Sequence, residues 1–190
     1  MKNSRLNIAL LSLIFAFTSC KKISESIQQD IIVNDTTSFE IPVLSNINSP
    51  ATIAGIPSHL NLEEQLRNTP NNFTIEHITA VKMKSLALLL DSIKIDLKNI
   101  IDTNNNFGNL ETIRFRIATG GNVSNIANAS VTSSSISGSL SLTPDILPDT
   151  LKSFIIQPSR TYNIVVKAKT ATATPMKVKA RAVYTITLSK

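Results

Sequence analysis

The chain offers few side chains that could carry out chemistry. Its 190 residues include one cysteine, Cys20, and two histidines, His59 and His77. That is too few for a Cys/His zinc site or a disulfide framework. Serines are plentiful, but no G-x-S-x-G elbow is present to activate one, and no spacing of the acids pairs two carboxylates. We therefore predict that the protein is not an enzyme and binds no cofactor and no metal.

Neither histidine has a neighbour suited to general acid–base chemistry. Glu76 and His77 are adjacent, so on a strand their side chains would point to opposite faces. His59 lies in a separate Pro/Ser segment. We expect both histidines to be structural or solvent-facing. The run from Asp102 to Gly108 has oxygen ligands at alternate positions, but its glycine comes one position late for an EF-hand loop, so we predict a polar turn.

The amino terminus has the pattern of an export signal. Lys2 and Arg5 precede an apolar stretch over 6–17, which is shorter than the roughly 20 residues of a transmembrane helix. The sequence FTSC, ending at Cys20, follows and resembles the lipobox of bacterial lipoproteins in the relaxed form of the Bacteroidota. This resemblance implies removal of 1–19 and acylation of the Cys20 thiol. An ordinary secretory peptide with a cysteine near its cleavage site is the alternative.

Acylation would tether the protein persistently to a membrane, because two or three acyl chains bury enough CH₂ groups. Lys21 and Lys22 stand where an inner-membrane retention signal would place Asp, so we expect the outer membrane. Surface-exposed lipoproteins of the Bacteroidota tend to carry acidic residues just after the cysteine, and only Glu25 is present here. The protein could therefore face either the periplasm or the cell exterior. Residues 20–37 show no sustained period and predict a tether, although residues 31–33 could begin a strand.

From residue 38 onward, alternating apolar residues predict strands. These strands cover 39–43, 73–83, 113–117, 140–142, 162–168 and 178–188. Residues 61–66 predict a short helix capped by Asn61, and 144–158 one or two helical turns. Residues 86–101 fit a strand slightly better than a helix. After Gly120-Gly121, the Asn/Ser/Thr-rich segment 122–137 predicts an exposed loop or a weak edge strand.

The last two strands predict a hairpin joined by residues 170–175. Short strands, frequent turns and many β-branched residues favour an all-β fold. We predict one domain over 38–190, a single two-layer antiparallel β-sandwich, immunoglobulin-like or similar, with one or two short helical turns.

Charge is distributed unevenly along this domain. The whole chain carries a net charge of +6, and all thirteen acids lie before residue 151. Within the predicted hairpin, cations alternate with the apolar positions and would share one outer face: Lys167, Lys169, Lys177, Lys179 and Arg181. Such a stripe could dock on an anionic lipid, an acidic glycan or an acidic protein; the alternative is a solvated face that blunts edge pairing. Nucleic acid is not expected, because the stripe has no aromatic platforms.

Three short segments resemble the D-S/T-hydrophobic pattern of O-glycosylation in the Bacteroidota. Their candidate sites are Thr36, Ser92 and Thr150. The function we expect is a non-catalytic outer-membrane lipoprotein that serves as a structural, accessory or docking module, with an outer-membrane protein complex or an anionic surface as partner. A glycan-binding or adhesive module and a carrier of an apolar ligand between the sheets are the alternatives. The absence of Trp disfavours the glycan reading.

Overall fold

The computed structural model describes residues 27–91, 93–95, 98–100, 102 and 104–190; the predicted signal peptide and Cys20 lie outside them. The strands are β1 (Gln28–Ile41), β2 (Ala51–Pro57), β3 (Ile78–Leu90), β4 (Ile93–Ile95), β5 (Lys98–Ile100), β6 (Leu110–Thr119), β7 (Asn122–Ser130), β8 (Ser139–Pro144), β9 (Thr161–Ala168) and β10 (Met176–Ser189). The helices are α2 (Leu62–Arg67) and α3 (Pro148–Ile155), with short 3₁₀ turns η1 (Ile75–His77) and η2 (Phe107–Asn109).

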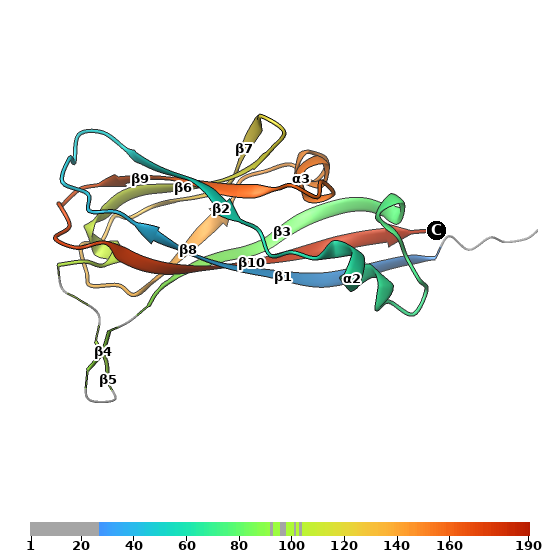
Figure 1. The fold of residues 1–190 in the computed structure, drawn as a ribbon, viewed down its shortest axis with the longest axis horizontal. Coiled ribbons are helices and arrows are strands. Elements are labelled where there is room, and N and C mark those ends of the chain that lie inside the picture. Colours follow the sequence, from blue (N-terminus) through green and yellow to red (C-terminus); the bar gives the residue numbers. More distant parts are fainter. Residues whose placement is uncertain (1–26, 92, 96–97, 101, 103) are drawn as a thin grey trace, which may run out of the picture.

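Eight strands form one curled sheet in the order β1-β10-β3-β8-β7-β6-β9-β2, and every pairing is antiparallel. Strand β8 pairs with β3 along one part and with β7 along another, which joins the two halves of the sheet. In Figure 1 the half with β1, β10 and β3 lies below the half with β2, β9 and β6. The all-β prediction is confirmed, in a sheet that is continuous through β8.

The core lies between the two halves of the sheet. On β9, Tyr162, Ile164, Val166 and Ala168 are buried. On β10, every second residue from Met176 to Leu188 is buried. Because alternate side chains point to opposite faces of a strand, the other residues of β9 and β10 form the outer surfaces. The predicted alternation of both strands is confirmed.

The predicted hairpin of the last two strands is wrong. Strand β9 pairs with β2 and β6, whereas β10 pairs with β1 and β3. The connecting loop crosses from one half of the sheet to the other, so the two strands face each other through the core. Thr172 holds this crossing, because its Oγ1 accepts a hydrogen bond from the Leu44 amide (2.8 Å) and its own amide donates to the Leu44 carbonyl.

The predicted tether is also corrected, since 28–37 form the first ten residues of β1 and pair with β10 along their whole length. The predicted alternative of a strand at 31–33 is the better reading. Two of the inward positions, Asp35 and Thr37, are polar and buried, whereas Ile32 points outward and is exposed. These three residues hide the alternation in the sequence. The strand predicted over 39–43 ends earlier, at Ile41, directly before Pro42, because proline has no amide hydrogen for the ladder.

The strand predicted over 73–83 begins later, at Ile78, because 75–77 form the turn η1. Residues 86–90 continue β3, and β4 with β5 makes a separate two-stranded sheet that projects from the body in Figure 1. The strand interpretation of 86–101 is confirmed for these described parts. Segment 122–137 was predicted as a loop or edge, but β7 covers 122–130 and lies inside the sheet, between β6 and β8.

Local signals in the sequence set the turns and helices. Gly120 and Gly121 adopt φ of 52° and 87°, the left-handed pair that a two-residue hairpin between β6 and β7 requires. Asn61 caps α2 as predicted, with its side-chain oxygen accepting from the Glu64 amide at 3.3 Å. Helix α3, which begins at Pro148, confirms the helical turns predicted over 144–158 and buries Leu151, Phe154 and Ile155.

Candidate functional site

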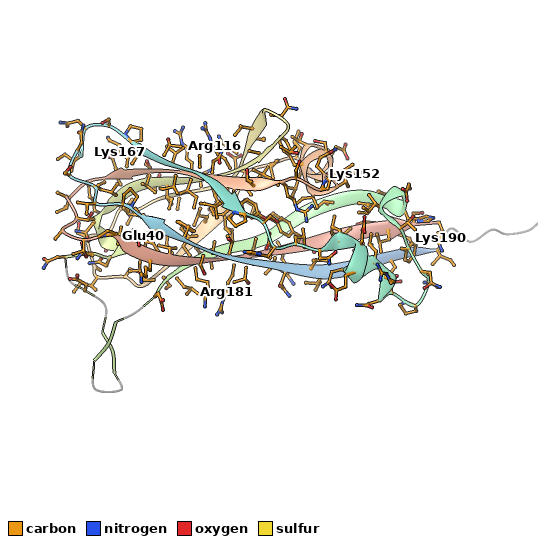
Figure 2. All side chains as sticks on the ribbon, viewed as in Figure 1. Glu40, Arg116, Lys152, Lys167, Arg181 and Lys190 are labelled. Carbon is orange, nitrogen blue, oxygen red and sulfur yellow. The ribbon has the colours of Figure 1, made fainter. Side chains whose placement is uncertain are left out.

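The five cations predicted to share one stripe lie on two opposite outer surfaces. Figure 2 shows Lys167 on the outer side of one half of the sheet and Arg181 on the outer side of the other. Lys167 and Lys169 belong to β9 and its following loop, whereas Lys177, Lys179 and Arg181 lie on β10. The structure therefore brings three of the predicted cations together and separates the other two from them.

The cations near β9 have partners within the protein. Lys167 Nζ lies 2.7 Å from Glu111 Oε2, and Lys169 Nζ donates to the carbonyl oxygens of Val131 (3.0 Å) and Ser133 (2.7 Å). On the same outer surface, Arg116 Nε donates to Asn125 Oδ1 at 2.9 Å. Exposed pairs of this kind contribute little stability, but they leave these cations less free for an external anion.

The cations of β10 are joined by two that the sequence reading did not assign to the site, Lys82 and Lys84 of β3. Both are exposed, and β3 is the direct neighbour of β10. We call Lys82, Lys84, Lys177, Lys179 and Arg181 the basic face. In the sequence, Lys82 and Lys84 alternate with the apolar Val81 and Met83, which predicts that the two lysines point outward. Their proximity to β10 could not be predicted, because it depends on a long-range strand pairing.

Two of the candidate glycosylation residues lie at the surface, and Ser92 and Cys20 lie outside the described residues. Thr36 is exposed on β1, directly opposite Arg181 of β10. Thr150 is exposed in α3. Thr36 and Thr150 therefore lie on different elements, and Thr36 borders the basic face.

A buried polar cluster, which sequence reasoning missed, links three strands of the core. The Asp35 carboxylate of β1 is only 3% exposed. Its Oδ2 accepts hydrogen bonds from Ser58 Oγ (2.6 Å) and from the Tyr162 hydroxyl (2.7 Å), and its Oδ1 accepts from the His59 amide (3.0 Å). The Tyr184 hydroxyl of β10 lies 2.9 Å from that of Tyr162.

The order of donors in this cluster follows from counting protons. Tyr162 gives its only hydroxyl proton to Asp35, so the Tyr184 hydroxyl donates to the oxygen of Tyr162. Burial, followed by the nearby Tyr184 and Asp35 groups, raises the pKa of Tyr162 well above its usual value. Burial also raises the pKa of Tyr184. Both tyrosines therefore stay neutral at any physiological pH.

Arg160 extends the cluster toward α3. Its guanidinium donates to the carbonyl oxygens of Ile155 (3.0 Å) and Gln157 (2.6 Å), to the Leu60 carbonyl and to Ser58 Oγ (3.2 Å). The fork geometry of arginine lets one side chain tie the end of α3 to the segment after β2. The polar groups of the cluster therefore serve as hydrogen-bond partners for one another. Such a cluster stabilises the contact between the two halves of the sheet.

The remaining candidates have structural roles. His77 Nδ1 lies 3.0 Å from the Thr74 amide nitrogen, which donates to it, and closes the turn η1, so the prediction of a structural histidine is confirmed there. The polar turn predicted from Asp102 is also present: Asp102 Oδ1 accepts from the Asn104 amide at 2.8 Å. Buried Asn105 accepts from the amides of Ala173 and Thr174, both at 2.8 Å, and holds the crossing loop.

Among the described residues, no group of three or more His, Cys, Asp or Glu side chains could hold a metal ion. Within the same part of the chain, no helix is long and apolar enough to cross a membrane. No protein-family model matches the sequence, and no curated protein matches it.

Proposed function

We propose that the protein is a non-catalytic lipoprotein of the outer membrane, anchored through acylated Cys20, whose β-rich head serves as a docking module in the cell envelope. We also propose that the head is best regarded as a two-layer β-sandwich, immunoglobulin-like in its general build. Support for the two layers comes from the Tyr162 and Tyr184 hydroxyls, which meet between β9 and β10.

The observation that carries the proposal is the position of the chain end nearest to Cys20. Ile27 directly precedes β1, and its carbonyl oxygen accepts a hydrogen bond from the Lys190 amide at 3.1 Å. The first and last described residues therefore meet at one end of the sheet, where Figure 1 marks the C-terminus. Cys20 lies seven positions before Ile27, a span of at most about 25 Å. An anchor at Cys20 would hold this end of the head close to the membrane.

Two features of the core weigh against the alternative functions. The chain has only two tyrosines and no tryptophan, and both tyrosines are buried, so neither can stack on a glycan from the surface. Between the halves of the sheet, Tyr162 contacts Phe115 with ring centroids 5.0 Å apart and also contacts Tyr184. Packed side chains fill that space, which disfavours a carrier of an apolar ligand.

Intact-mass spectrometry of the protein purified from envelope membranes tests the anchor. The expected mass is that of residues 20–190 plus a diacylglycerol group, with or without a further acyl chain. A Cys20→Ala variant provides the matched control and should remain unprocessed and without lipid. A mature chain that begins elsewhere, with a free thiol or without Cys20, would contradict the proposal.

A further inference from the structure

We propose that the basic face is the surface with which the head lies on a membrane, and that its ligands are the phosphates of anionic lipid headgroups. The inference rests on the proposed function in one respect, because the anchor at Cys20 would keep the head close to the lipid. The contact between the basic face and the headgroups does not require the anchor.

The cations of the basic face are exposed and unengaged. Within the described part of the chain, none of the five side-chain cations makes a hydrogen bond or an ion pair, whereas the side chains of Lys167, Lys169 and Arg116 on the opposite surface are each bound to protein atoms. Cations that a protein does not satisfy internally remain available to an external anion. The difference between the two outer surfaces selects the basic face over the surface that carries Lys167.

The cations form one continuous row. Lys177, Lys179 and Arg181 follow each other on β10 at every second position, and Lys84 and Lys82 continue the row on β3, where Lys82 lies opposite Thr185. At about 3.4 Å per residue the row is about 27 Å long. It therefore runs along the sheet from the start of β10 toward the end of the head where Ile27 and Lys190 meet.

The residues beside the middle of the row are neutral. On β1, Lys179 faces Ser38 and Arg181 faces Thr36; on β3, they face Leu89 and Ala87. The outward-facing acids of β1 stand at its two ends, with Glu40 opposite Lys177 and Asp30 opposite Thr187, whereas Asp35 points into the core. Glu40 and Asp91 therefore lie beside the Lys177 end of the row. No carboxylate lies opposite Arg181 on either neighbouring strand to offset its positive charge.

A membrane suits this surface better than a peptide partner. The five cations lie on the outer side of two adjacent strands, with no aromatic side chain among the pairs that flank them. A broad row of single charges matches an array of headgroup phosphates, each cation near an anionic surface contributing about a fivefold gain in binding. The short span to Cys20 would keep the face within reach of the bilayer.

The test uses the full lipidated chain reconstituted into vesicles of phosphatidylcholine alone or mixed with phosphatidylglycerol. A fluorophore on Ser38→Cys reports the basic face, because Ser38 neighbours Lys179. A fluorophore on Thr52→Cys, exposed on β2 in the other half of the sheet, is the control position. Headgroup-linked nitroxide lipids quench whichever label approaches the bilayer.

We expect strong quenching at Ser38→Cys in the anionic vesicles, weak quenching in neutral ones, and reversal by salt. The triple variant Lys84→Gln/Lys179→Gln/Arg181→Gln should lower the docking constant roughly a hundredfold. The variant Arg114→Gln/Lys152→Gln/Lys167→Gln removes equal charge elsewhere and should leave quenching unchanged. Equal quenching of both labels, or equal effects of both variants, would overturn the inference.

A separate measurement tests the anchor independently of the basic face. The chain without an introduced cysteine holds only Cys20, which cannot react with maleimide when it is acylated. Labelling of that chain would contradict the anchor alone. Anionic vesicles would then still bind the protein through the basic face, and loss of binding in the Lys84/Lys179/Arg181 variant but not in its control would support the contact. Absence of such binding would overturn it.

Discussion

The hydroxyl groups of Tyr162 and Tyr184 lie 2.9 Å apart in the core, although β9 and β10 belong to opposite halves of the sheet. The contact continues to Asp35 on the edge strand β1, which in turn binds Ser58 and the His59 amide just beyond the other edge strand, β2. One chain of hydrogen bonds therefore links β9 and β10, which lie in opposite halves of the sheet, with β1 and the segment that follows β2 at the two edges.

Tyr162→Phe should destabilise the protein more than Tyr184→Phe. The Tyr162 hydroxyl serves both Asp35 and Tyr184, so its loss leaves a buried carboxylate short of one donor and Tyr184 without an acceptor. We expect about 2 to 3 kcal/mol for Tyr162→Phe and about 1 kcal/mol for Tyr184→Phe. Urea unfolding followed by circular dichroism measures both. Equal losses would contradict the donor order given above.

Stability should fall as the pH rises above about 10, the usual pKa of an unfolded tyrosine. Burial raises the pKa of both tyrosines in the folded state. Above pH 10 the unfolded chain therefore binds fewer protons than the folded one, and the free energy of unfolding decreases by up to about 1.4 kcal/mol per pH unit for each tyrosine.

Because the chain has two tyrosines and no tryptophan, tyrosinate absorbance reports this effect directly. We expect the absorbance to appear together with unfolding rather than before it. The Tyr184→Phe variant is the control and should show a shallower dependence on pH. Ionisation of either tyrosine near pH 10 in a protein that is still folded would refute the prediction.

Arg160→Lys should cost about 1 to 3 kcal/mol. A lysine ammonium cannot reproduce the fork that reaches the carbonyls of Ile155, Gln157 and Leu60 together. Arg114→Lys, at an exposed position of β6, is a matched control for the loss of a guanidinium. Thermal unfolding of the two variants decides the question, and a similar small change in both would show that charge alone matters at Arg160.

Gly108→Ala should destabilise the segment that follows β7. A methyl group at Gly108 would collide with the backbone oxygen of Ser135 and approach that of Ser134 to 3.1 Å. We expect a loss of about 1 to 3 kcal/mol from this overpacking. Amide hydrogen exchange should become faster around Ser137, whose backbone contacts Asn106 and Phe107. Unchanged exchange there would show that the segment can shift without cost.

Several parts of the fold could be predicted from the sequence because local physics decides them. Alternation of apolar residues identified β9 and β10, since a two-residue period buries one face whatever the strand pairs with. Asn61 identified a helix start, and the glycine pair at 120–121 identified the end of a strand, since caps and left-handed glycine conformations depend on neighbouring backbone atoms.

What failed depended on long-range pairing. Residues 28–37 did not look like a strand because Asp35 and Thr37 are polar, and only the partners Tyr162, Ser58 and Pro57 make their burial possible. The sequence by itself determined that Lys177, Lys179 and Arg181 share one side of a strand, because their spacing is two. Only the tertiary structure could add Lys82 and Lys84 and separate Lys167 and Lys169, because strand order in a sheet is set by contacts between distant segments.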